Sequence, residues 1–131
     1  MKKIFYFALV LLLSVPAVSN AQQKKPVWAE LKQFHTVMSA TFHPAEEGNL
    51  APLRERAGEL FQAAQKWQEA EIPAGFKKEE TKATLKELVI KCGAVMKGVE
   101  ARKADADLTR LITEAHDVFH KIVGECRETD H

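Results

Sequence analysis

The stretch LTRLITEAHDVFHKIVGEC, from Leu108 to Cys126, carries the clearest structural pattern in the chain. Its apolar residues recur at three- and four-residue steps, which indicates a helix with one buried face. These apolar residues are Leu108, Leu111, Ile112, Ala115, Val118, Phe119, Ile122 and Val123. His116 and His120 lie one turn apart on the flank of that face, so both imidazoles project the same way and could hold one ion. We therefore expect the rest of the chain to enclose this helix.

Three further amphipathic segments precede it. The pattern predicts helices over about 27–41, from 50–52 to about 70, and over about 78–102. We expect the first helix to end at His43-Pro44, because the residue before a proline is pushed out of the helical region. Asp105 or Asp107 is expected to cap the last helix. The connections are short and no strand pattern occurs, so the sequence predicts an all-α, up-down-up-down antiparallel four-helix bundle.

The first residues have the features of a secretory signal peptide. Two lysines precede an apolar run at 4–15, Pro16 follows, and small residues lead up to Ala21. The apolar run is shorter than the ~20 residues of a membrane span. We therefore expect a signal peptide at 1–21 and a mature four-helix-bundle domain at 22–131. The two lysines and the simple cleavage site are typical of a bacterial periplasmic protein.

The charge of the chain excludes several kinds of partner. The chain has 19 basic and 18 acidic residues, and two of the lysines fall in the signal peptide, so the mature charge is about −1. A mixed, nearly neutral surface has no basic patch for nucleic acid and no polybasic arm for lipid. We expect neither nucleic acid nor, after removal of the signal peptide, a membrane as partner.

Four histidines are expected at one end of the bundle. Counted from that end, His35 and His116 fall in one layer, His120 lies one turn deeper, and His43 lies at the rim. The first and last helices adjoin in this topology, so His35, His116 and His120 supply enough imidazoles for zinc or copper, with His43 a fourth. Glu46 or Glu47 could complete the coordination if the first helix folds towards the last. The alternative is a hydrogen-bonded core histidine at 35 and an incidental pair at 116 and 120.

Sulfur-containing residues are expected mainly in the core. Cys92 reads as a small buried apolar residue. In the same register Cys126 lies ~15 Å further along the axis, beyond the ~7 Å that bridged Cα atoms allow, although a break at Gly124 could bring it back. Residues after Cys126 read as a frayed tail. Met38 is expected to fill the core, or to serve as a soft ligand to haem or Cu(I) opposite a histidine.

The predicted bundle resembles the periplasmic four-helix-bundle cytochromes of the cytochrome c-prime type. The resemblance covers the mature chain and rests on the signal peptide, the four helices, Met38 in the first helix and His116 in the last. That family attaches haem through Cys-x-x-Cys-His, whereas this chain has Ile112-Thr113-Glu114-Ala115-His116 and lacks both cysteines. The resemblance implies a ligand-binding core, with His116 in the place of the haem ligand. It also implies a homodimer.

No catalytic motif is present. A di-iron bundle needs a Glu-x-x-His pair on each of two helices, and the nearest match, Asp117-x-x-His120, occurs once. His-Glu-x-x-His, a Gly-rich phosphate loop and Gly-x-Ser-x-Gly are all missing. We therefore expect a non-enzymatic protein that binds zinc or copper. The alternatives are an electron-transfer protein that binds haem b non-covalently through His116 and Met38, and an interaction module without a ligand.

Overall fold

The computed structural model describes residues 28–128, which form four helices joined by short connections. Within these residues the one extended pairing is an isolated bridge between Phe76 and Arg127. The helices are α1 (Ala29–Glu46), α2 (Ala51–Glu69), α3 (Lys78–Glu100) and α4 (Asp105–Gly124). The all-α prediction is therefore confirmed for the described part of the chain. The predicted signal peptide at 1–21 lies outside it.

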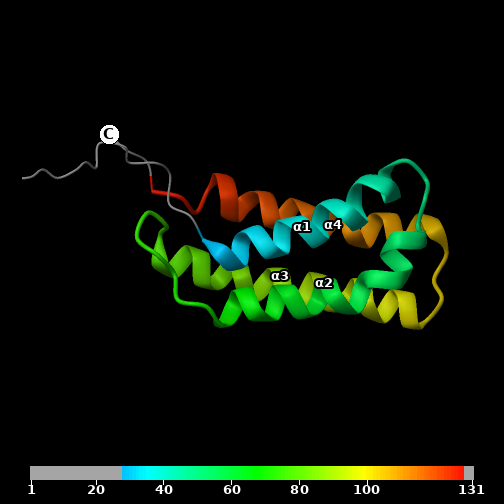
Figure 1. Ribbon diagram of the computed structural model, residues 1–131, viewed down its shortest axis with the longest axis horizontal. Helices are drawn as coiled ribbons and strands as arrows, with labels where there is room; N and C mark the ends of the chain where they lie inside the picture. Colours follow the sequence, from blue (N-terminus) through cyan, green and yellow to red (C-terminus); the bar gives the residue numbers. More distant parts are fainter. Residues whose placement is uncertain (1–27, 129–131) are drawn as a thin grey trace, which may run out of the picture.

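The helices pack as neighbours along the long axis of the molecule (Figure 1). α1 and α4 lie on one side and α2 and α3 on the other, and the connections α1–α2 and α3–α4 share one end. Arg54 near the start of α2 joins these connections, because its guanidinium donates to the Lys103 carbonyl at 3.1 Å and to Asp105 at 2.6 Å. Successive helices pack closely, whereas α1 and α4 touch more sparsely. This packing is consistent with a four-helix bundle.

The core is built largely from the stripes that the sequence predicts. In α4 the fully buried residues are Leu108, Ile112, Ala115, Val118, Phe119 and Ile122. Two further members of the predicted stripe, Leu111 and Val123, pack at its edge and are partly buried. Burying one such large apolar side chain stabilises the fold by about 1.5–3 kcal/mol. The amphipathic pattern of the last helix therefore identifies its core face correctly.

The predicted end of the first helix is wrong. α1 continues through Pro44 to Glu46, although proline cannot donate to the carbonyl four residues earlier. The added turn is held by Ala45, which is only 2% exposed. Its end is closed by Gly48 at φ 90°, whose N–H donates to the Ala45 carbonyl at 3.0 Å, while the Asn49 N–H donates to the Pro44 carbonyl at 2.9 Å. Tertiary burial and a good C-terminal cap thus outweigh the local effect of proline.

The predicted buried face of the first helix is also shifted. His35 is exposed, and Phe34, one position earlier, is fully buried in its place. The observed buried residues of α1 are Phe34, Val37, Met38, Thr41, Phe42 and Ala45. The sequence predicts a stripe at three- and four-residue steps through Trp28, Leu31, His35, Met38 and Phe42. The observed apolar face is instead centred on Phe34 and Met38. His35 consequently stands at the edge of the core.

The helix ends facing the α3–α4 connection differ slightly from expectation. α3 ends at Glu100, and Arg102 adopts a left-handed φ of 57°. The Arg102 N–H donates to the Val99 carbonyl and the Lys103 N–H to the Gly98 carbonyl, both at 3.0 Å. No side chain caps α4, whose N-cap is Ala104. The capping role predicted for Asp105 or Asp107 is therefore wrong, and Asp105 instead pairs with Arg54.

Both cysteines are free and buried, as the register indicated. Burial raises the pKa of the Cys92 thiol to about 12, so this thiol is a packing group at neutral pH. Cys126 lies at the other end of α4, where its carbonyl accepts from the Lys77 N–H at 2.7 Å. The Glu128 N–H also donates to the Gly75 carbonyl at 2.8 Å. The predicted fraying is therefore wrong for residues 127 and 128.

Candidate metal centre

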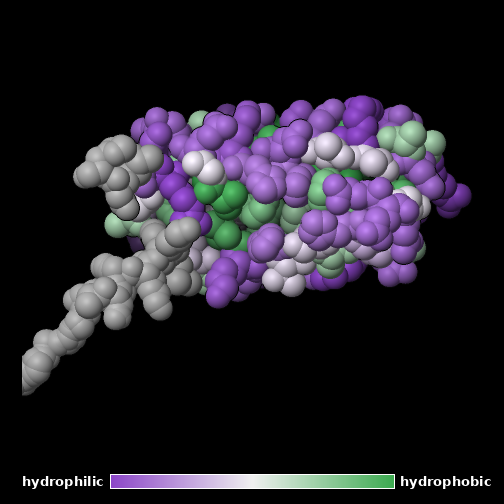
Figure 2. Space-filling view, turned by 90° about the horizontal axis from the view of Figure 1, so that it is seen from above, coloured by the Kyte–Doolittle hydropathy of each residue, from purple (hydrophilic) through white to green (hydrophobic). Residues whose placement is uncertain are grey.

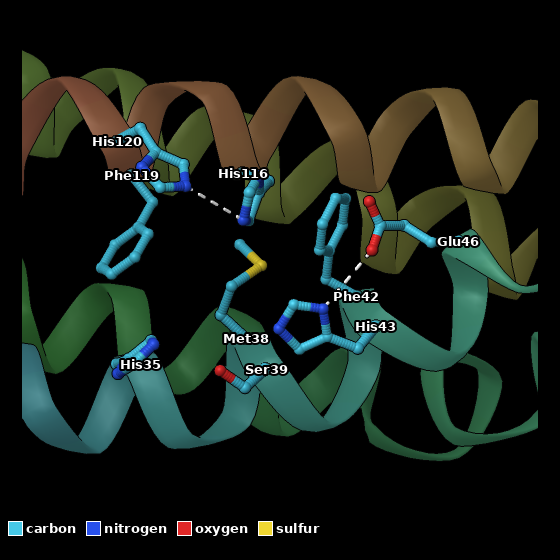
Figure 3. A pocket seen from close by; sticks show the side chains of 9 residues that line it. All are labelled: His35, Met38, Ser39, Phe42, His43, Glu46, His116, Phe119 and His120. Atoms are coloured by element: carbon cyan, nitrogen blue, oxygen red, sulfur yellow. Dashed lines mark hydrogen bonds and ion pairs between the residues drawn. The ribbon is translucent and has the colours of Figure 1, made fainter.

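A pocket of about 290 Å³ lies between α1 and α4. Of the neighbouring helix pairs, this is the one that packs most sparsely. Figure 2, which looks onto this side of the molecule, shows hydrophobic surface recessed between hydrophilic flanks. Figure 3 shows the side chains that line the pocket: His35, Met38, Ser39, Phe42, His43, Glu46, His116, Phe119 and His120. The structure thus brings together the four histidines that the sequence singled out. It does not bring Glu47 to the pocket.

α4 positions the closest pair of nitrogens in the pocket. Because His116 and His120 are four residues apart on one helix, their rings meet at 4.4 Å between centroids. Their two Nε2 atoms are 3.2 Å apart and share a hydrogen bond. Two nitrogens bound to one ion at ~2.05 Å with a tetrahedral angle lie ~3.3 Å apart. The pair therefore has the spacing that a tetrahedral or near-tetrahedral ion requires.

The His116 ring is held in place by aromatic packing. It stacks on the Phe42 ring of α1, with 3.7 Å between centroids and 8° between planes. Burial lowers the pKa of His116, and the nearby positive charge of protonated His120 lowers it further, while Asp117 and Glu46 act in the opposite direction. A metal-binding imidazole must be neutral. Packing and burial therefore both prepare His116 to act as a ligand.

His43 and Glu46 form the rim of the pocket at the end of α1. The His43 Nδ1 lies 3.4 Å from a Glu46 carboxylate oxygen, and both side chains are exposed. Figure 3 shows the other ring nitrogen of His43 directed towards the pocket. A carboxylate that accepts from Nδ1–H leaves Nε2 with its lone pair free for a metal. The turn of α1 beyond Pro44 is what places Glu46 there.

His35 lies at the opposite edge of the pocket. Its exposed imidazole stacks on Phe119 of α4, with 5.5 Å between centroids and 14° between planes. In Figure 3 it stands across the pocket from His120. His35 and the α4 pair thus lie on opposite sides of one pocket, as the sequence predicts. The His35 ring packs against Phe119, however, and is not close enough to the pair to share one ion with it.

The four histidines do not form a closed coordination sphere. Among residues 28–128, no three His, Cys, Asp or Glu side chains are grouped closely enough to hold a metal ion. The preformed element is the His116–His120 pair. Met38 adds a sulfur to this pocket although the residue is only 1% exposed. The sequence indicated Met38 as a possible ligand and favoured the core for Phe42 and Phe119, with a ligand pocket as their less favoured place; both phenyl rings, each next in sequence to a pocket histidine, line the pocket.

A second hollow, of about 400 Å³, lies across α2 and α3. Its lining is mainly apolar and consists of Phe61, Val89, Ile90, Gly93, Ala94, Met96 and Lys97. Ile90 is 62% exposed, the one large hydrophobic side chain in the described part of the chain with such exposure. This α2–α3 groove contains no histidine or carboxylate and therefore has no ligand set for a metal.

Comparison with known proteins adds no assignment. No protein-family model, curated protein or solved structure matches the chain. None of the helices within residues 28–128 is both long and apolar enough to cross a membrane. The function of the protein is therefore inferred from the geometry of the pocket.

Proposed function

We propose that this protein is a periplasmic, non-enzymatic four-helix bundle of up-down-up-down topology that binds a zinc or copper ion through histidines of α1 and α4. The observation that carries the proposal is the 3.2 Å separation of the Nε2 atoms of His116 and His120. This spacing matches two ligands of one tetrahedral ion. The ion would take the place of this hydrogen bond, and the proton on the donating Nε2 would move to Nδ1 of the same ring or to solvent.

The remaining ligands come from α1. His43 and His35 line the same pocket with exposed side chains, so rotation about their side-chain bonds costs little packing. Exposed side chains change rotamer within nanoseconds. A site completed by mobile surface ligands exchanges its ion readily, which suits metal sequestration, delivery or sensing better than a permanent structural role.

The test is a calorimetric zinc titration of the metal-free mature protein beside two single variants, His116→Ala and His131→Ala. We expect one-to-one binding in the wild type and in the control His131→Ala, whose substitution lies outside the described residues. His116→Ala is expected to bind at least about 100-fold more weakly, because it removes half of the preformed pair. Equal affinity in the His116→Ala variant and the wild type would refute the proposal.

Non-covalent binding of haem b for electron transfer is the second candidate. Its support is that His116 and Met38, the expected axial ligands, line one pocket. A pocket of about 290 Å³ is small for this purpose, because sites for drug-sized ligands span ~300–1,000 Å³. A macrocycle would therefore require α1 and α4 to separate. A Soret band after expression in the periplasm supports haem, and a colourless protein rules it out.

The α2–α3 groove supports a third candidate, a protein-interaction module or homodimer. Exposed apolar patches on soluble proteins often mark interaction sites. Ile90, which lines this groove, is the large hydrophobic side chain of the described residues that is most exposed. Sedimentation velocity of the wild type and of Ile90→Lys distinguishes the cases. A wild-type dimer that becomes monomeric in Ile90→Lys supports this candidate. If the wild type and the variant are both monomeric, the homodimer is excluded.

A further inference from the structure

We propose that the ion bound in the pocket is Cu(I), held by Nε2 of His116, Nε2 of His120 and the thioether sulfur of Met38. This inference rests on the proposed function and names the metal of that same site. It starts from the fact that the three side chains come from facing helices and line one pocket.

The position of Met38 is the first argument. A methionine in a core usually fills a gap between apolar neighbours. Met38 is buried to 1% exposure, yet it also lines the pocket, and Figure 3 shows its side chain extended from α1 towards His116, with the terminal methyl group nearest that ring. Rotation of the terminal methyl group about the bond between Cγ and the sulfur would turn the thioether towards an ion beside the two imidazoles, and it requires no movement of a helix.

The chemistry of the available donors is the second argument. Zinc sites in proteins are built from Cys, His, Asp and Glu, and no three such side chains converge within the described residues. Two imidazole nitrogens 3.2 Å apart and one thioether line this pocket. Thioether sulfur is a soft ligand that selects Cu(I) among biological metals. The histidine pair together with the Met38 thioether thus matches Cu(I) better than zinc.

The surroundings of the donors are the third argument. Phe42 and Phe119 form apolar walls beside the two imidazoles, and both phenyl rings are nearly fully buried. Imidazole and thioether groups bind an ion as neutral ligands, and Glu46, the one carboxylate that lines the pocket, lies at its rim next to His43. Transfer of an ion into apolar surroundings is less costly for a single charge than for a double charge. Neutral donors and apolar walls therefore favour Cu(I) over divalent ions.

The experiment compares Cu(I) with Zn²⁺ in three forms of the metal-free mature protein: wild type, Met38→Leu and Met96→Leu. Cu(I) affinity is measured anaerobically, with reductant, by competition against a chromophoric Cu(I) chelator, and zinc affinity by calorimetry. Leucine conserves most of the volume of methionine. We expect Met38→Leu to weaken Cu(I) binding by about tenfold or more and to leave zinc affinity within about twofold, because only the soft ligand is lost. Met96→Leu, in the α2–α3 groove, is expected to change neither.

A Met38→Leu variant with unchanged Cu(I) affinity would overturn the inference while leaving histidine-based metal binding intact. Absence of both zinc and Cu(I) binding in the wild type would overturn the proposed function as well. X-ray absorption of the copper-loaded wild type provides a readout that does not depend on the variant folding. A sulfur scatterer beside nitrogen supports the inference, and a shell of nitrogen alone overturns it.

Discussion

The pocket between α1 and α4 and the groove across α2 and α3 are hollows of similar size with opposite chemistry. The pocket measures about 290 Å³ and holds four histidines, a methionine and a carboxylate. The groove measures about 400 Å³ and has Lys97 as its one charged lining residue. A protonated lysine has no lone pair for a metal. The comparison shows that donor atoms, and not the size of a hollow, identify the candidate site in this molecule.

The sharpest test of this contrast removes the ligand pair in one hollow and the exposed apolar residue in the other. We expect His116→Ala combined with His120→Ala to abolish metal binding, because no preformed pair of nitrogens remains. Ile90→Lys in the groove is expected to leave metal affinity unchanged. Calorimetry with zinc measures both variants. Loss of binding in Ile90→Lys would show that the two hollows are not independent.

Removing a phenylalanine from the pocket should destabilise the protein more than removing one from the groove. Phe119 is 5% exposed and contacts Phe34 and Trp67 as well as the histidines, so Phe119→Ala should lower the free energy of unfolding by about 3 kcal/mol. Phe61 in the groove is only partly buried, and Phe61→Ala should lower it by about 1 kcal/mol. Urea denaturation of the metal-free proteins measures both values. Equal losses would contradict the view that the pocket wall belongs to the core.

A smaller effect is expected at the rim of the pocket. Glu46→Gln removes the charge that orients His43 through its Nδ1, and we expect metal affinity to fall by about tenfold. Glu47→Gln is the matched control, because Glu47 is the next residue and does not line the pocket. Titrations of both variants under identical conditions provide the comparison. A loss in both would indicate a general effect of surface charge.

The smallest effect is expected outside both hollows. Arg102 has a φ of 57°, a conformation in which glycine carries no steric penalty. Arg102→Gly should therefore raise the free energy of unfolding by about 0.5 kcal/mol and leave the metal affinity unchanged. Urea denaturation measures the first value and calorimetry the second. A destabilised variant would mean that the Arg102 side chain contributes more than its backbone strain costs.

Much of the fold was predictable from the sequence because its apolar residues follow the helical period. The buried face of α4 and the bounds of α2 and α3 agree with the predictions to within about two residues. The largest errors lie in α1, and smaller ones concern the cap of α4 and the residues after Cys126. The rule for the residue before proline is local, and it does not include the burial of Ala45 or the cap at Gly48 that carry the helix past Pro44.

The candidate site was predictable only in part. Counting layers along antiparallel helices places histidines of the first and last helices near one another, and the structure groups them around one pocket. The count contains no information on side-chain rotamers. It could not show the 3.2 Å approach of the α4 pair, the stacking of His35 on Phe119 or the extension of the Met38 side chain towards His116.

The aromatic packing behind the pocket places both tryptophans near the proposed metal site. The Trp67 ring lies 6.0 Å from Phe119 between centroids, and Trp28 lies 5.5 Å from Trp67, so both indoles stand within a few side chains of the imidazoles. Cu(II) quenches indole emission at short range, whereas zinc, with its filled d shell, does not. If the pocket also admits Cu(II), we expect the intrinsic fluorescence of the unlabelled protein to fall as Cu(II) is added and to stay constant as zinc is added.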